Sequence, residues 1–207
     1  TGLRVGVVAE GFGHENSQPD VDSKVRKAAD RMARLGAEVS DISIPMHRLT
    51  REIWIPIGHD GGFRTMMATH GAGGNHEGLY LPSLINAASN WKSRSDEFAD
   101  TMKIIALFGH YSLKHYRGHY YAKAMNLRRK LRTAYDTALK DVDLLLMPTL
   151  PMKASKLPGA DATPEATTAV AWEMLANTCG VNLTGHPAMS LPCGIEDNRP
   201  IGLMLIG

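Results

Sequence analysis

The sequence predicts an α/β fold, and three observations lead to this prediction. A short Val-rich run at residues 3–9 is typical of a buried strand. An amphipathic segment follows, and residues 37–44 then have the composition of a second strand, so that strand, helix and strand alternate. Residues 144–147 form an apolar run that is too short for a helix and ends at Pro148, which indicates an interior strand.

The segment between the first two strands is predicted to be a helix. Asp20 is in position to cap its start, and Gly36 to end it. We expect an irregularity in the second strand at Asp41. The apolar residues of the helix recur at helical spacing and form one stripe: Val21, Val25, Ala28, Met32 and Leu35.

The middle of the chain is predicted to be mostly helical. One helix is expected from about residue 48 to residue 70, loosened by Pro56 and by the Gly61-Gly62 pair. A loop is expected at residues 71–78. Because there is no internal repeat or interdomain linker, we expect one domain over residues 1–207. Further helices are expected at residues 83–91, 95–111, 122–140 and 167–177.

Composition excludes several classes of function. The 23 Lys and Arg residues nearly balance the 21 Asp and Glu residues, so the net charge of +2 gives no general attraction to nucleic acid or to an anionic membrane. No apolar run approaches the roughly 18 residues of a membrane helix. The two cysteines do not make a disulfide framework, which favours a reducing compartment, and we predict a cytoplasmic protein.

Several motifs have a plain structural interpretation that we favour over a functional one. EGFGHEN resembles a dinucleotide loop, but Asn16 replaces its third Gly. His115 and His119 have a spacing that suits a metal, but no HExxH pattern accompanies them. The basic run KAMNLRRKLR is expected to be the solvated face of a helix. A cysteine hydrolase using Cys193 and His186 stays open, although nothing nearby predicts a lowered thiol pKa.

Three stretches of the sequence resemble the amidase signature family. They are DLLLMPTLP at residues 143–151, NLTGHPAMSLPCG at 182–194 and PIGLMLIG at 200–207, in the family's order and spacing. With the similar segments IWIPIGHDGG and GLRVGVVAEG, the resemblance covers essentially the whole chain. It implies a mixed sheet covered by helices, and an enzyme that hydrolyses a small neutral carboxamide to a carboxylic acid and ammonia. It implies no metal and no organic cofactor, and a homodimer is common among similar enzymes.

The resemblance also implies a mechanism for which this sequence lacks the residues. The family uses a nucleophilic Ser, a second Ser in a cis peptide and a Lys, with a Gly/Ser-rich loop that holds the oxyanion. That loop is absent, and in the family these residues precede the point where this chain begins. We therefore assign no catalytic residue here. We predict a C-terminal portion of an amidase, itself missing its last segment, that is inactive alone.

We expect this portion to form a wall of the substrate pocket. Met147 and Thr149 lie at the end of a strand, where ligands of α/β sheets gather. Each candidate also has a structural interpretation: core packing for Trp54, Met147 and Leu175, and a local hydrogen bond for Thr149 and Thr184. His186 is expected to make a structural hydrogen bond. A non-catalytic binding or assembly module with an amidase-like half is the alternative. The five pocket candidates are Trp54, Met147, Thr149, Leu175 and Thr184.

Overall fold

The computed structural model describes residues 2–72 and 77–207, which group into two compact units. The sheet unit consists of the stretch up to Arg51, Leu127–Asp161 and Ala169–Gly207. The helical unit consists of Glu52–Asn126 and Ala162–Thr168. The loop expected at residues 71–78 lies partly outside the described residues.

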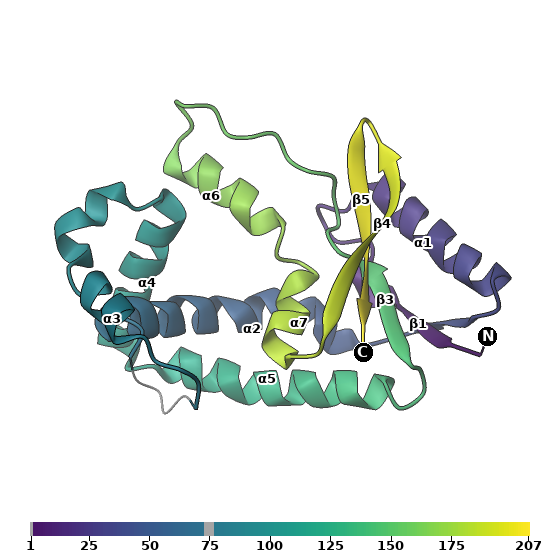
Figure 1. Ribbon diagram of the computed structural model, residues 1–207, viewed down its shortest axis with the longest axis horizontal. Coiled ribbons are helices and arrows are strands. Elements are labelled where there is room, and N and C mark those ends of the chain that lie inside the picture. Colours follow the sequence, from purple (N-terminus) through teal and green to yellow (C-terminus); the bar gives the residue numbers. More distant parts are fainter. Residues whose placement is uncertain (1, 73–76) are drawn as a thin grey trace. The chain divides into compact units, whose positions relative to one another are not determined.

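Five strands within the described residues form one mixed sheet (Figure 1). They are β1 (Arg4–Val8), β2 (Glu38–Ile42), β3 (Leu144–Pro148), β4 (Ala188–Glu196) and β5 (Arg199–Ile206). The spatial order is β2–β1–β3–β5–β4. β1 is parallel to β2 and β3, whereas β5 is antiparallel to β3 and β4. The predicted α/β fold with a mixed sheet is thus confirmed.

The interior position of β1 and β3 follows from their apolar side chains. Val5 and Leu145 are fully buried, as expected for strands that are covered on both faces. β2 lies at an edge, and all of its side chains are at least partly exposed. Its register with β1 is regular, with Val7 opposite Asp41. The irregularity expected at Asp41 is therefore wrong, because an exposed edge strand accommodates a charged side chain without a bulge.

Helix α1 (Pro19–Arg34) packs against the sheet, and only part of its predicted stripe is buried (Figure 1). Val21 and Val25 are buried, but Leu35 is 74% exposed because the helix has ended before it. Gly36 has a φ of 98°, which confirms it as the left-handed residue after the helix. The prediction that Asp20 caps the helix is wrong, because Pro19 is the first helical residue and Asp20 follows it.

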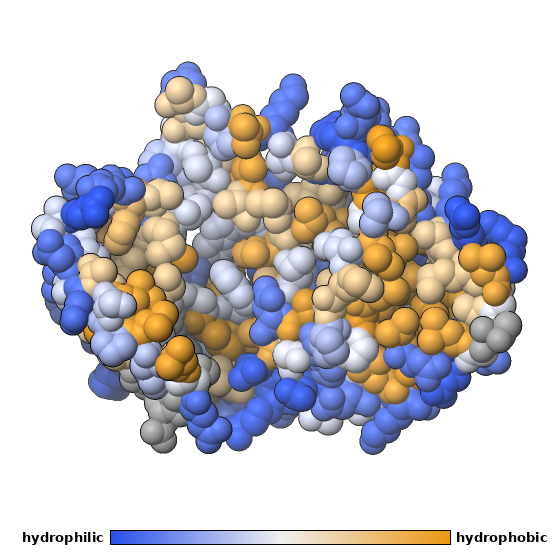
Figure 2. Space-filling model, viewed as in Figure 1, coloured by the Kyte–Doolittle hydropathy of each residue, from blue (hydrophilic) through white to orange (hydrophobic). Residues whose placement is uncertain are grey.

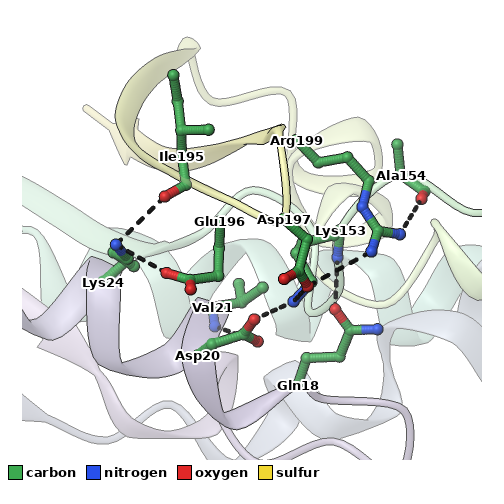
Figure 3. Close-up of polar contacts among 10 residues, drawn as sticks. All are labelled: Gln18, Asp20, Val21, Lys24, Lys153, Ala154, Ile195, Glu196, Asp197 and Arg199. Atoms are coloured by element: carbon green, nitrogen blue, oxygen red, sulfur yellow. Dashed lines mark hydrogen bonds and ion pairs between the residues drawn. The ribbon is translucent and has the colours of Figure 1, made fainter.

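Lys153 lies in the segment after β3 and ties three parts of the sheet unit together (Figure 3). Its ammonium contacts Asp20 of α1 and, at 2.9 Å, the carboxylate of Asp197 between β4 and β5. Its backbone N–H donates to Gln18 Oε1 at 3.0 Å. The Lys153 side chain is only 8% exposed, whereas those of Asp20 and Asp197 are 31% and 61% exposed, so the two ion pairs are sheltered from water on the lysine side only. They hold in place the segment that begins at Thr149.

β4 and β5 form a hairpin that leaves apolar side chains at the surface. Asp197 and Asn198 have positive φ angles of 48° and 60°, as a two-residue type I′ turn requires. β4 is the edge strand, and its Met189 and Ile195 are 57% and 66% exposed. Figure 2 shows hydrophobic side chains on the surface over β3, β4 and β5. This part of the sheet unit is therefore an apolar surface.

The segment before β4 contains a helix that sequence reasoning missed. Residues 167–177 were expected to be one helix, but α6 (Pro164–Glu173) ends earlier and α7 (Thr178–Thr184) follows. The sequence TCGVNLT contains Gly and β-branched residues, which have low helix propensity. α7 ends at Gly185, whose φ of 75° allows its N–H to bond the carbonyl of Val181.

The helical unit contains an unusual run of π-helix. The helix predicted at residues 48–70 forms as α2 (Thr50–Pro56) and continues as two π-helical segments, Ile57–Gly61 and Phe63–Ala68. Helix α4 (Asp100–Tyr116) packs closely on this run at Gly109, where a Cβ would collide with the carbonyl oxygen of His59. The unit also contains α3 (Pro82–Ala88), a 3₁₀ stretch (Trp91–Glu97), the first turns of α5 (His119–Ala138) and the start of α6.

α4 and α5 are separated by two residues of left-handed backbone. Arg117 and Gly118 have φ angles of 54° and 79°, so the helix stops at Tyr116. His115 and His119, expected on one helix face, therefore belong to different helices. None of the helices formed by residues 2–72 and 77–207 is both long and apolar enough to cross a membrane.

Candidate functional site

The carboxyl ends of β1 and β3 meet at one edge of the sheet, where Asn177 connects them. Its Nδ2 donates to the carbonyl of Gly11, just after β1, at 3.0 Å. The same nitrogen donates to the carbonyl of Pro148, the last residue of β3, at 2.7 Å. Asn177 is fully buried, so water does not compete for these bonds. Ligands of open α/β sheets gather at such an edge, which makes it the candidate site.

The bonds of Asn177 determine which ring nitrogens carry protons. Its Nδ2 is a donor, so Oδ1 is the acceptor for His47 Nε2 at 2.9 Å and for His14 Nε2 at 2.8 Å. Both Nε2 atoms are therefore protonated, which leaves each Nδ1 as an acceptor. Tyr135 Oη, 2.6 Å from His47 Nδ1, donates to it. Arg48 Nη1, 3.4 Å from His14 Nδ1, is a donor as well.

Burial favours the neutral form of His47, which lies at the centre of this hydrogen-bond network. The pKa of His47 falls from 6.5 to about 4, chiefly because burial penalises the charged ring. Burial also lowers the pKa of His14 and raises the pKa of Tyr135. Neutral, fully bonded groups are poor candidates for proton transfer at neutral pH. The network is best suited to holding the strand ends in position.

Two hydroxyl groups meet beside these strand ends. Thr149 Oγ1, one residue after β3, lies 2.7 Å from Ser190 Oγ of β4. β5 runs between them, and at Gly202 a Cβ would lie 2.7 Å from Ser190 Oγ and 3.1 Å from Thr149 Oγ1. A glycine inside a strand often marks such a close approach. Ser190 is exposed and Thr149 is half-buried, so a ligand can reach the hydroxyl pair Thr149–Ser190.

Two arginines of α5 anchor the end of α7. Arg128 Nε donates to the carbonyl of Leu183, and Arg132 Nη1 donates to the carbonyl of Thr184 at 3.1 Å. Cations at a helix C-terminus bind carbonyls that have no partner within the helix. Part of the basic run KAMNLRRKLR is thus bonded within the protein. His186, just beyond α7, makes the structural hydrogen bond expected of it, with Nε2 3.1 Å from Asp136 Oδ1.

Four of the five predicted pocket residues lie in the sheet unit. Met147 is fully buried in β3, directly before Pro148. Thr184 is fully buried at the end of α7, and its Oγ1 has no hydrogen-bond partner among the described residues. Leu175 is half-buried, and its carbonyl accepts a bond from the Cys179 N–H. Of these, Thr149 alone places a polar side-chain atom at the accessible strand end.

The fifth predicted residue, Trp54, lies in α2. Its ring is half-buried and meets the ring of His59 edge-on at 6.4 Å. In the adjoining π-helical turn Asp60 is buried, and its Oδ2 accepts a bond from Ser112 Oγ at 2.9 Å. The other oxygen, Oδ1, has no hydrogen-bond partner in the described part of the chain. Burial raises the pKa of Asp60, which favours the protonated carboxyl.

Of the residues that organise the sheet edge, sequence reasoning identified Thr149 but missed His47, Asn177 and Ser190. His47 and Asn177 are 130 positions apart, and Thr149 and Ser190 are 41 apart, so no local spacing connects them. The glycine within the apolar run IGLMLI was a signal available in the sequence, since Gly202 interrupts an otherwise continuous strand. Asn177, in contrast, follows an apolar helical segment without any distinguishing pattern.

Comparisons with known proteins all find similarity to amidases and to related proteins. Residues 1–207 match the Amidase family model. An enantioselective amidase of Rhodococcus rhodochrous is 36% identical over 208 residues, covering 100% of this chain and 40% of that protein. A subunit of the glutamyl-tRNA(Gln) amidotransferase of Synechococcus sp. strain RCC307 is 34% identical, over 99% of this chain and 41% of that protein.

Two further matches are a shorter protein sequence and a solved structure. An uncharacterized protein in the nthA 5′ region of Rhodococcus erythropolis is 42% identical over 156 residues, which are 75% of this chain and 78% of that protein. A solved amidase structure superposes with a TM-score of 0.70 at 20% identity, over 99% of this chain and 41% of that one. The chain thus spans about 40% of the length of the amidase and amidotransferase relatives that it matches.

Proposed function

The chain belongs to the amidase signature family, and from this premise we propose that it forms one wall of the substrate pocket of an amide hydrolase. The reaction converts a small neutral carboxamide and water to a carboxylic acid and ammonia. The attacking serine and its base come from residues outside these 207. The observation that carries the proposal is the match of the whole chain to 40% of an enantioselective amidase.

The chemistry of the hydroxyl pair Thr149–Ser190 supports a neutral amide as the ligand. Each hydroxyl both donates and accepts, and a carboxamide has one acceptor oxygen and an N–H donor group. The pair lies where β3 ends, next to strand ends that Asn177 holds with two hydrogen bonds. A rigid, uncharged support of this kind suits the positioning of a substrate rather than its activation.

The apolar surface over β3, β4 and β5 supports the idea that more polypeptide covers this wall (Figure 2). β4 is an edge strand, so one side of its backbone is free to pair with a further strand. Its exposed Met189 and Ile195 offer apolar area for packing. We therefore place the catalytic portion of the enzyme against this part of the sheet unit.

The test is ammonia release from benzamide and propionamide. We expect none from the 207-residue chain, and turnover from the longer polypeptide in which an amidase N-terminal portion precedes it. In that polypeptide Ser190→Ala and Thr149→Val should each lower kcat/KM by about tenfold, the value of a lost hydrogen bond to the transition state. Turnover by the 207-residue chain alone, unchanged by Cys179→Ala and Cys193→Ala, would contradict the proposal.

A second candidate function is that of an amidotransferase component, which the 34% identity to a glutamyl-tRNA(Gln) amidotransferase sequence favours. In that case the amide nitrogen passes to an acceptor instead of into solution. Release of ammonia from L-glutamine, but not from benzamide, would favour this candidate. If neither amide reacts in the longer polypeptide, the binding or assembly module is the better interpretation. The cytoplasmic location and the homodimer stay predictions.

A further inference from the structure

The helical unit contains a cavity that the proposed reaction does not use. Its volume of about 540 Å³ lies within the range of small-molecule sites. Its walls come from three elements of that unit: the second π-helical segment, the 3₁₀ stretch and α4. The hydroxyl pair and the strand ends contribute nothing to it, because all of its lining residues belong to the helical unit.

Two pairs of aromatic rings line this cavity. Trp91 and Phe98 stack, with centroids 5.9 Å apart and planes inclined by 15°. The indole Nε1 donates to the carbonyl of Met67 at 2.9 Å, so the only polar atom of the Trp91 side chain is satisfied and its ring is held in place. Phe63 and His110 meet edge-on at 5.4 Å. Rings held in this way can offer both faces and edges to a flat aromatic ligand.

The polar part of the lining favours an anion. Among the described residues that line the cavity, two are lysines and one is an acid, Asp96. The ammonium of Lys92 lies 5.9 Å from the centre of the Trp91 ring, beside the aromatic wall. Lys103 Nζ is 3.8 Å from Asp100 Oδ1, which is longer than a hydrogen bond, so its N–H donors have capacity for another carboxylate.

We propose that this cavity binds an aromatic carboxylate. The aromatic ring of the ligand packs between the Trp91–Phe98 pair and the Phe63–His110 pair. Its carboxylate is bound by Lys92 and Lys103, the two cationic side chains of the described lining; Asp96 is the acid among the lining residues, and Asp100 lies 3.8 Å from Lys103. The inference stands without the proposed function, although the hydrolysis of an aryl amide would release a ligand of this class.

The test is isothermal titration of the purified protein with benzoate, benzamide and cyclohexanecarboxylate as probes. We expect one benzoate site per chain. Benzamide should bind at least tenfold more weakly, because it lacks the charge that the lysines recognise, a loss in the range of charged hydrogen bonds. Cyclohexanecarboxylate should also bind more weakly than benzoate, because it has no π face.

Variants of the lining show whether the probe occupies this cavity. Lys103→Met should weaken benzoate binding by about tenfold, whereas Lys114→Met, the same change farther along α4, should leave it unchanged. Ala106→Trp should abolish binding by filling the space, with circular dichroism confirming that the helices persist. Three results would each overturn the proposal: no benzoate binding, equal binding of benzamide, or binding insensitive to both lining variants. Binding is read without turnover, so an inactive protein still provides the test.

Discussion

The hydroxyl of Tyr135 lies 2.6 Å from Nδ1 of His47, and neither side chain is exposed to solvent. The hydroxyl is the donor, because Nε2 of the same ring gives its proton to Asn177. Protonation of His47 would place an N–H against this hydroxyl, which would have to turn its own hydrogen away from the ring within a buried site. The pair therefore favours a neutral imidazole.

This preference for the neutral ring predicts that the protein loses stability in mild acid. The pKa of His47 is about 4 when folded and near 6.5 when unfolded. Because the folded pKa is the lower one, the contribution to stability is complete above pH 6.5. It is lost as pH falls from 6.5 to 4, where the unfolded state takes up the proton first. The two pKa values correspond to about 3 kcal/mol at the acid limit.

Urea unfolding between pH 7.5 and pH 4 measures this loss. His47→Gln retains one acceptor and one donor but does not titrate, so its free energy of unfolding should fall less steeply with acid. His119→Gln, at an exposed position on α5, is the matched control and should follow the unmodified protein. Parallel curves for the protein and His47→Gln would show that His47 is not the group responsible.

Asn177→Ala is predicted to destabilise the protein more than the same substitution at an exposed asparagine does. The change leaves the carbonyls of Gly11 and Pro148 and two ring N–H groups without their partner. A buried group without a partner costs about 1–3 kcal/mol, so a loss of about 3 kcal/mol or more is expected. The measurement is thermal unfolding of Asn177→Ala compared with that of Asn182→Ala, the same change at an exposed position. A difference below about 1 kcal/mol would mean that water replaces the amide.

Much of the fold could be predicted where one residue pattern decides the structure. After the exposed Arg4 at the start of β1, the Val-rich run of β1 has no polar residue, and neither does the LLLM run of β3, so burial and strand position follow directly. α1 was predictable from the helical spacing of its apolar residues, although the position of its C-terminal end was not. Leu35 continues the apolar stripe in sequence, but Gly36 ends the helix and leaves Leu35 exposed.

The features that were not predicted from the sequence depend on contacts between residues that are distant in the sequence. α7 has weak helix propensity, but its last carbonyls are bound by Arg128 and Arg132 from α5, a context that no local pattern contains. The hydroxyl pair illustrates the same limit at the site. Thr149 was identifiable as a residue at a strand end, whereas Ser190 becomes its neighbour only because β5 lies between β3 and β4.

Gly202→Ala is predicted to separate the hydroxyl pair at little cost in stability. The new methyl group would lie 2.7 Å from Ser190 Oγ, which can escape by rotating, so we expect a loss of about 1 kcal/mol, at the low end for overpacking. In the longer polypeptide kcat/KM should fall by about tenfold, as in Ser190→Ala. Adding Ser190→Ala to Gly202→Ala should then cost little more activity. Additive losses would show that Gly202 acts through another group.

Asp60→Asn is predicted to stabilise the helical unit at neutral pH. Burial raises the pKa of Asp60, so the stability that its neutral form contributes is complete below the unfolded pKa of 3.8 and is lost as pH rises through the folded pKa. Asparagine keeps an acceptor for Ser112 and stays neutral at every pH. The melting temperature of the variant should exceed that of the protein at pH 7, and the advantage should shrink toward pH 4. Asp96→Asn, at an exposed carboxylate of the same unit, is the control. A variant less stable at pH 7 would mean that the Oδ1 position cannot accommodate the N–H groups of the amide, or that a bound cation holds the carboxylate there.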